Sequence, residues 1–137
     1  MRCPCCGAAQ LVVTRRAGRA IRYRNTALTL PPDLPLPSSR RCRYEDLSLA
    51  TLPSGLLESL YRSSLRERAQ IEIKRLRQNI AQNKLELLLN LSHGYLCRLG
   101  AGDGVPSAPL VSLLALLADR PELIEQLKDY WALPPGG

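Results

Sequence analysis

Phenylalanine is absent from this chain, and aromatic residues make up only 4% of its 137 residues. Any hydrophobic core must therefore be built mainly from leucine. Histidine occurs once, as His93, and the dispersed acidic residues come without a phosphate-cradling glycine loop. Catalysis needs a nucleophile, a base and a stabilising group within reach of one another, so we expect the protein not to be an enzyme.

The sequence also lacks a long apolar run and an apolar leader. No segment is long and continuous enough to span a membrane, and Met1 to Cys6 does not have the apolar region of a signal peptide. The five cysteines, three of them within four residues, suit a reducing compartment and a metal site better than a disulfide framework. We therefore expect a soluble cytoplasmic protein with no membrane partner.

Positive charge is in excess and unevenly distributed. The formal net charge is +7, and the isoelectric point is near 9.5. Residues 1–50 contribute +6 and residues 51–100 contribute +4, whereas residues 101–137 contribute −3. A basic body is typical of proteins that bind DNA or RNA, and an acidic tail suits contact with a protein.

The first 50 residues have the composition of a small β module. Two β-branched runs, residues 10–15 and 21–29, flank Ala17 and Gly18, and this pattern predicts a hairpin. Prolines then interrupt residues 31–37, which we expect to be an extended crossing segment without regular pairing.

From Pro53 onward the leucines recur at helical spacing. The periodicity leaves open whether residues 54–79 form one helix or two. The later expected helices are 82–89, 92–99, 109–118 and 121–130. The predicted division is a β module at 1–50, a linker helix at 51–69, a helix-turn-helix domain at 70–133 and a disordered tail at 134–137. The predicted fold class is α+β, with a small zinc-ribbon-like β module followed by an all-α helix-turn-helix bundle.

Cys3 and Cys6 have the spacing of two thiolates that hold one tetrahedral zinc ion. Cys42 can supply a third thiolate. A β module so poor in aromatic residues needs an additional constraint, which favours bound Zn²⁺. The competing interpretations are a site that has lost its metal and cysteines that are buried as small apolar residues.

The fourth ligand depends on the register around Cys42. Ser39 lies three residues before it and Glu45 three residues after it, while Cys5 and Asp46 are further candidates. A carboxylate is a legitimate zinc ligand and a serine hydroxyl is a poor one. The predicted set is Cys3, Cys6, Cys42 and Glu45.

The leucine pattern between residues 82 and 99 predicts a helix-turn-helix. Ser92 is a good N-cap for the second helix. The predicted inward-facing residues are Leu85, Leu88, Leu89, Leu96 and Leu99. This assignment leaves His93, Gly94, Cys97 and Arg98 on the outer side, where a recognition helix presents its polar groups.

The same segment resembles the Xre/Cro-type helix-turn-helix over roughly residues 70–130. The matching positions are Gln82, Leu88 to His93, Leu96, Arg98, Leu99, Gly102, Pro106 and Ser107. The closing segment 118–124 resembles the last helices of the MqsA-type antitoxins. In that family a Cys-rich, YgiT-type zinc module precedes the helix-turn-helix domain, as the cysteines do here.

The resemblance implies a role in binding double-stranded DNA for a set of residues around the two helices: Gln82, Asn83, Lys84, Ser92, His93, Gly94, Tyr95 and Arg98. Arg98 suits guanine, whose O6 and N7 accept a bidentate guanidinium. The resemblance further implies a homodimeric repressor on a palindromic operator, with a possible cognate toxin as partner. We expect the acidic final helices, with Leu123, Ile124, Leu127 and Trp131, to supply the dimer contact.

A second hypothesis is a protein-binding adaptor, or an accessory protein of a mobile element, whose helix-turn-helix serves assembly. Gly94 and Gly100 favour it, because they stand where the Xre/Cro family often has a base-reading and an acidic side chain. The positive charge of residues 51–100 favours DNA.

Overall fold

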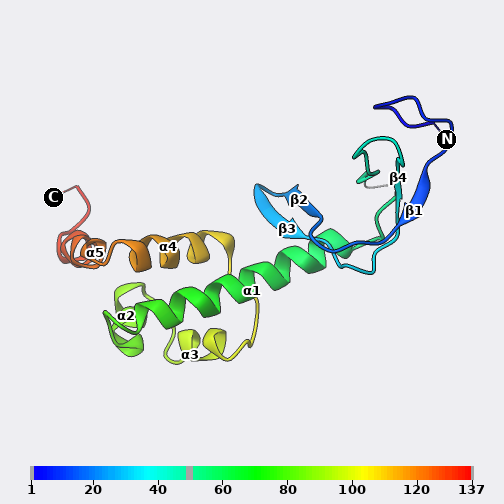
Figure 1. The fold of residues 1–137 in the computed structure, drawn as a ribbon. Coiled ribbons are helices and arrows are strands. Elements are labelled where there is room, and N and C mark those ends of the chain that lie inside the picture. The colour runs from blue at the N-terminus through cyan, green and yellow to red at the C-terminus, as the bar shows by residue number, and fades with distance from the viewer. Residues whose placement is uncertain (1, 49–50, 137) are drawn as a thin grey trace. The chain divides into compact units, whose positions relative to one another are not determined.

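The computed structural model describes residues 2–48 and 51–136 (Figure 1). Within these described ranges, four strands come first and five helices follow. The chain divides into two compact units, Met1–Tyr61 and Arg62–Gly137, and the boundary falls inside helix α1 (Leu56–Leu76). The predicted α+β fold class is confirmed: small antiparallel sheets precede a helical region.

The N-terminal unit contains two two-stranded antiparallel sheets. The strands are β1 (Val12–Thr14) paired with β4 (Leu36–Ser38), and β2 (Ala20–Tyr23) paired with β3 (Thr26–Thr29). The predicted hairpin between residues 10–15 and 21–29 is therefore wrong. The second run folds into a hairpin by itself, and the first run pairs with the proline-rich segment.

The hairpin turns at Arg24 and Asn25, because Tyr23 pairs directly with Thr26 and leaves a two-residue loop. Both loop residues have positive φ, 48° and 59°, as a type I′ turn requires. The Arg24 guanidinium lies over the rings of Tyr23 and Tyr61, 5.5 and 5.4 Å from their centroids. These contacts stabilise an arginine in a conformation that favours glycine or asparagine.

Strand β4 also corrects the expectation for residues 31–37. Leu36 and Pro37 pair with Thr14 and Val13, although proline has no N–H to donate. Proline is tolerated in such a small sheet because its unpaired side can face away from the neighbouring strand. Leu36 is fully buried, so the hydrophobic contact compensates for the missing donor.

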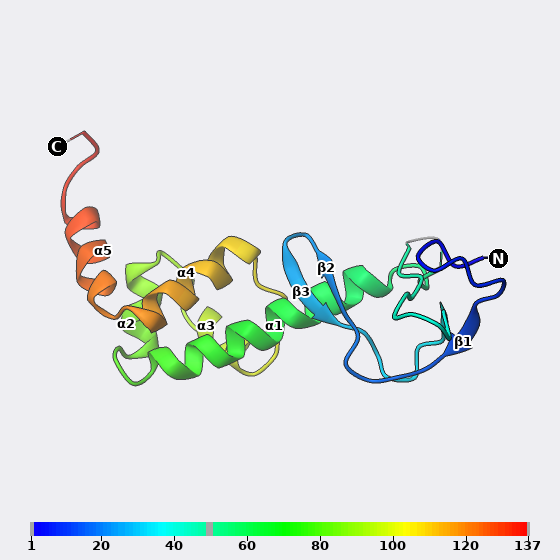
Figure 2. The same cartoon turned by 45° about the horizontal axis from the view of Figure 1, so that its top comes forward.

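The C-terminal unit contains part of α1 and four shorter helices: α2 (Gln82–Leu88), α3 (Tyr95–Gly100), α4 (Ala108–Asp119) and α5 (Glu122–Ala132). Figures 1 and 2 show α4 alongside the second half of α1, and Arg75 on α1 donates to Asp119 on α4 at 2.6 Å. The segment 54–79, left open as one helix or two, contains the single helix α1.

Leucine and isoleucine fill the core of this unit, as the composition requires. The buried cluster comprises Ile73, Leu76, Leu85, Leu96, Leu99, Leu114, Leu117 and Ile124. Leu88 and Leu89 pack partly against it, so the predicted inward-facing leucines of the helix-turn-helix are confirmed. Ser107 caps α4 by accepting the N–H of Leu110 at 3.3 Å.

Residues 134–136, in the predicted tail, are exposed, and Gly137 lies outside the described residues. Within the described ranges, no helix has both the length and the apolar character needed to cross a membrane.

Candidate functional site

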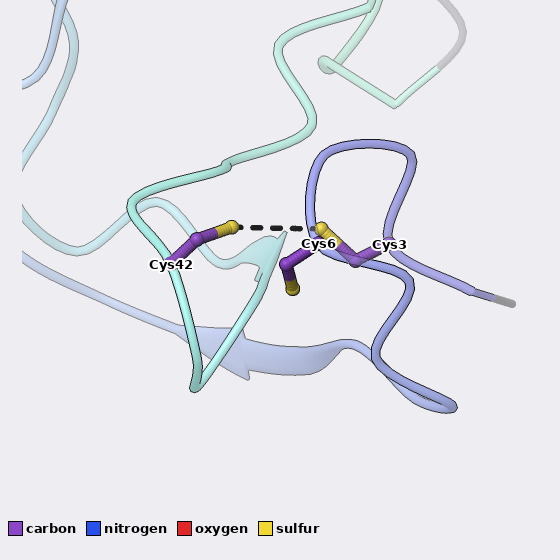
Figure 3. A group of neighbouring side chains, drawn as sticks. All are labelled: Cys3, Cys6 and Cys42. Carbon is purple, nitrogen blue, oxygen red and sulfur yellow. Dashed lines mark hydrogen bonds between the residues drawn. The ribbon is translucent and has the colours of Figure 1, made fainter.

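Three cysteines lie together in the N-terminal unit (Figure 3). The Sγ atoms of Cys3, Cys6 and Cys42 are all within 4.8 Å of one another, and those of Cys3 and Cys42 are 3.6 Å apart. Cys3 and Cys6 belong to the loop before β1, and Cys42 follows β4. The pairing of β1 with β4 therefore brings the two loops together. Three thiols at this separation can hold one metal ion.

The first loop is shaped by its own backbone. The N–H of Gly7 donates to the carbonyl of Cys3 at 3.0 Å, and the N–H of Cys3 donates to Ala8 at 3.0 Å. Burial raises the pKa of the Cys3 thiol, but the backbone N–H groups of Cys6 and Cys5 and the two neighbouring thiols lower it, to about 7. Cys3 is thus prepared to act as a thiolate near neutral pH.

The pKa of Cys42 shifts in the opposite direction from that of Cys3. The Ser39 hydroxyl and the N–H of Tyr44 lower the pKa of Cys42, but burial and the nearby Cys3 and Cys6 raise it, and the net shift is upward. A second negative charge beside Cys3 is unfavourable unless a cation is present. The cluster therefore favours a bound cation electrostatically.

Glu45, predicted as the fourth ligand, does not lie with the cysteines. Its two carboxylate oxygens accept hydrogen bonds from Arg16 and Arg19. Arg19 is only 2% exposed and also donates to the carbonyls of Leu34 and Thr14, at 2.6 and 2.8 Å. The prediction failed because a buried arginine requires a carboxylate partner, and Glu45 is that partner.

Burial alone would raise the pKa of Glu45, but the hydrogen bonds and charges of Arg16 and Arg19 lower it below its ordinary value. Glu45 therefore has a structural role as the partly buried partner of the buried Arg19.

The other candidates for the fourth ligand differ in whether they lie beside the three cysteines. Asp46 accepts from the Ser48 N–H at 3.0 Å and from the Thr51 hydroxyl at 2.8 Å, which stabilises the following turn. Cys5 is exposed and outside the three-cysteine group. Ser39, which the sequence ranked lowest, has its Oγ 3.3 Å from Cys6 Sγ.

A second candidate site is the α2–α3 segment of the C-terminal unit. The main chain leaves α2 through a left-handed residue, Asn90, with φ of 56°. The N–H of Leu91 donates to the carbonyl of Glu86 at 2.9 Å, and the N–H of Asn90 donates to that of Leu87 at 3.3 Å. This is a Schellman motif, which ends α2 sharply and turns the chain towards α3.

Helix α3 begins at Tyr95, three residues later than predicted, and Ser92 is not its cap. The preceding residue is Gly94, which has φ of 81°, and no side chain at the N-cap position bonds the helix. The buried carboxylate of Glu86 replaces the predicted cap, since it accepts the N–H groups of Gly94 at 3.2 Å and Leu96 at 2.8 Å. This cap could not be predicted from a local motif, because Glu86 lies nine residues before Tyr95, the first residue of the helix.

Three of the four predicted outward-facing residues are exposed, and the fourth, Gly94, is partly buried. His93, Cys97 and Arg98 are exposed, whereas Leu96 and Leu99 on the same segment are almost fully buried. His93 lies in the turn before α3 and Arg98 lies within the helix. An imidazole, a thiol and a guanidinium are therefore available on the outer side of this short helix.

The other predicted DNA contacts have varied surroundings. Asn83 and Lys84 are exposed on α2, and Ser92 is exposed in the turn. Tyr95 is half-buried and packs against the leucine core. The side-chain oxygen of Gln82, with the amide in its better hydrogen-bonded orientation, accepts from Arg77 Nη2 at 2.7 Å and Nε at 2.8 Å.

Two charged groups at the end of α1 are already engaged within this unit. Arg75 donates to Glu72 at 2.8 Å and to Asp119 at 2.6 Å, and Arg77 donates to Gln82. Lys74 is exposed. These two arginines therefore contribute less free positive surface than the net charge of residues 51–100 suggests.

Comparison of this chain with protein-family models and with curated proteins finds no match.

Proposed function

We propose that this protein is a DNA-binding transcriptional regulator of the MqsA-like antitoxin type, with Zn²⁺ held by its cysteine cluster. The observation that carries the proposal is the separation of residue types on α3 and the turn before it. Leu96 and Leu99 on α3 are buried in the core, while Arg98 on α3 and His93 in the preceding turn are exposed. A recognition helix needs this division between anchoring and reading residues.

Electrostatics support nucleic acid as the partner. The net charge of the chain is +7, and the exposed Lys84 lies on α2 beside Asn83. Lysine contacts with phosphates set position and affinity, whereas Arg98 has the planar donor group that distinguishes guanine. In this proposal the protein represses its own operon by binding a palindromic operator as a homodimer.

The exposed C-terminal aromatic residues support a dimer. Tyr130 and Trp131 are 67% and 55% exposed, and their rings meet edge to face at 5.1 Å. Leu133 is 63% exposed beside them. Ile124, which we expected in the dimer contact, is instead a core residue of the monomer. A cognate toxin as a further partner rests on the resemblance to the MqsA-type antitoxins.

Zinc is the metal that the donor set favours. Three thiolates suit a borderline-soft cation without redox chemistry, and a closed structural site would stabilise the small β module. Metal analysis of the purified protein should find one equivalent of zinc, which the double variant Cys3→Ser, Cys6→Ser loses. The variant Cys5→Ser, which changes a thiol outside the cluster, should keep it.

The decisive experiment compares binding to the chain's own upstream promoter with binding to random DNA of equal length. Arg98→Ala should weaken specific binding by about 1–3 kcal/mol and leave random binding nearly unchanged. Arg120→Ala, which removes an exposed arginine of the same unit beyond the end of α4, is the matched control. Equal losses on both DNAs would reduce Arg98 to a phosphate contact, and no promoter binding at all would reject DNA recognition.

The adaptor hypothesis has one observation in its favour. Leu87 on α2 is 76% exposed, and a large apolar side chain is unusual at a DNA surface but common where proteins meet. Leu87→Ser should then abolish assembly with a protein partner without changing promoter affinity. If the wild type does not bind the promoter but still assembles with a protein partner, the adaptor hypothesis is favoured.

A further inference from the structure

The three-cysteine cluster leaves one position of a tetrahedral metal site to be assigned. Structural sites for tetrahedral ions are closed by four protein ligands as a rule. Here the three thiols come from two loops, with two on the first loop and one on the second. The missing ligand is therefore expected on the second loop, close to Cys42.

Ser39 has the same relation to Cys42 as Cys3 has to Cys6. Each pair is separated by two residues. The N–H of Cys3 donates to the carbonyl of Ala8, five residues on, and the N–H of Ser39 donates to the carbonyl of Tyr44, also five residues on, both at 3.0 Å. The N–H groups of Arg41 and Cys42 also donate to Ser39 Oγ, at 3.1 and 3.3 Å. The two loops thus have one construction, with a hydroxyl in place of one thiol.

Two separations in the cluster are close to the lengths of two opposite edges of one tetrahedron. With metal–sulfur bonds of about 2.3 Å and a metal–oxygen bond of about 2.0 Å, the edges are about 3.8 Å between sulfurs and about 3.5 Å between sulfur and oxygen. Cys3 and Cys42 are 3.6 Å apart, and Cys6 and Ser39 are 3.3 Å apart. These two edges share no atom, so together they include all four corners.

The competing donors are engaged elsewhere or lie outside the group. Both oxygens of Glu45 bind arginine, and those of Asp46 bind the turn that follows it. Cys5 is exposed and outside the group of thiols. Among the described residues weighed for this position, Ser39 is the one whose donor atom contacts the cluster.

We propose that Ser39 Oγ is the fourth protein ligand of the metal ion held by Cys3, Cys6 and Cys42. The site then has three sulfur donors and one oxygen donor. This inference rests on the metal binding proposed above and adds a property to it. A hydroxyl is a weaker donor than a thiolate for a borderline-soft cation, so the ion is held less tightly than four cysteines would hold it.

The test uses the full chain loaded with Co²⁺, whose absorption spectrum depends on the number of sulfur donors, and with Zn²⁺ in competition with a chelator. Ser39→Cys keeps an acceptor for the two N–H groups and adds a thiolate. It should bind Zn²⁺ at least about tenfold more tightly and move the Co²⁺ spectrum to that of a four-sulfur site. Ser39→Ala should bind at least about tenfold more weakly, because even outer partners of metal ligands are worth about 10- to 100-fold.

Cys5→Ala and Glu45→Gln are the controls for the two other donors that the sequence offered. Both should keep the wild-type Co²⁺ spectrum. If Ser39→Ala and Ser39→Cys both match the wild type in spectrum and affinity, the Ser39 contact is only a hydrogen bond and the inference is overturned. A wild type that binds neither metal rejects the proposed metal site itself. If Ser39→Ala does not fold, the Ser39→Cys protein alone decides the question. Absence of four-sulfur Co²⁺ absorption in that protein then rejects Ser39 as the fourth ligand.

Discussion

The carboxylate of Glu86 in α2 accepts the backbone N–H of Leu96 in α3 at 2.8 Å, and both residues are buried. The other oxygen of the same carboxylate accepts the N–H of Gly94 at 3.2 Å. A single side chain therefore satisfies two N–H groups at the start of a helix that lacks a local cap. The orientation of α3 relative to α2 depends on this link.

Replacing Glu86 should therefore destabilise the C-terminal unit. Glu86→Ala leaves two N–H groups without their acceptor and should lower the free energy of unfolding by about 1–3 kcal/mol. Glu86→Gln keeps one acceptor oxygen and should cost less. Chemical denaturation followed by Trp131 fluorescence measures both, with the exposed Glu67→Ala as control. A Glu86→Ala protein as stable as the control would mean that water replaces the carboxylate without cost.

Asn90 should show the energetic signature of a left-handed residue. Its φ of 56° is unfavourable for residues with a Cβ, and asparagine tolerates it better than alanine. Asn90→Ala should lose about 1 kcal/mol of stability, whereas Asn90→Gly should be neutral or slightly stabilising. Asn79→Ala, at an exposed asparagine without positive φ, is the matched control. Equal effects of alanine at 79 and 90 would show that the turn adapts.

The ion pair of Glu45 with Arg19 should make the N-terminal unit sensitive to acid. The folded-state pKa of Glu45 lies below its ordinary value of 4.5. Its contribution to stability is therefore fully present above pH 4.5 and is lost as the pH falls below that value. Glu45→Gln should be less stable than the wild type at pH 7, and the difference should shrink at pH 3.5.

Denaturation of metal-free protein, followed by tyrosine fluorescence, measures this difference without a contribution from metal loss in acid. The exposed Asp33→Asn should show no such convergence. A gap between Glu45→Gln and wild type that stays constant from pH 7 to 3.5 would contradict the assignment.

Removing the metal should affect the two units unequally. The cysteine cluster joins the loops before β1 and after β4, whereas the leucine core of the C-terminal unit includes none of its residues. Addition of a strong chelator should increase hydrogen exchange in β1 and β4 and leave α2 and α4 protected. Cys42→Ser without chelator should reproduce the pattern. A uniform change in both units would show that the cluster is not a local support.

The features that could be predicted from the sequence depend mostly on the local spacing of residue types. Leu85, Leu96 and Leu99 are buried as their helical spacing predicts, because an amphipathic helix can bury its apolar stripe in one way. The proximity of Cys3 and Cys42, which are 39 positions apart, was also predictable, since two loops that carry cysteines commonly hold a metal ion between them.

The remainder depended on contacts between distant residues. Arg19 resembles its many exposed neighbours in the sequence, but it is buried because Glu45 and two carbonyls surround it. Val13 pairs with Pro37 in a sheet, although proline usually interrupts strands because it has no N–H to donate. Ser39 was ranked last because its type is a poor ligand, although its spacing from Cys42 is the spacing of a ligand. In these three cases the residue type alone predicts the wrong environment, because contacts with residues distant in the sequence determine it.

Position 94 restricts how this protein can diversify. Its φ of 81° strains every residue with a side chain, and a Cβ there would lie 3.4 Å from Arg98 Nη1. Substitutions at 94 would therefore strain the backbone at the start of α3. If this surface binds DNA as proposed, changes in its contacts would arise instead at exposed neighbouring residues such as His93, Cys97 and Arg98.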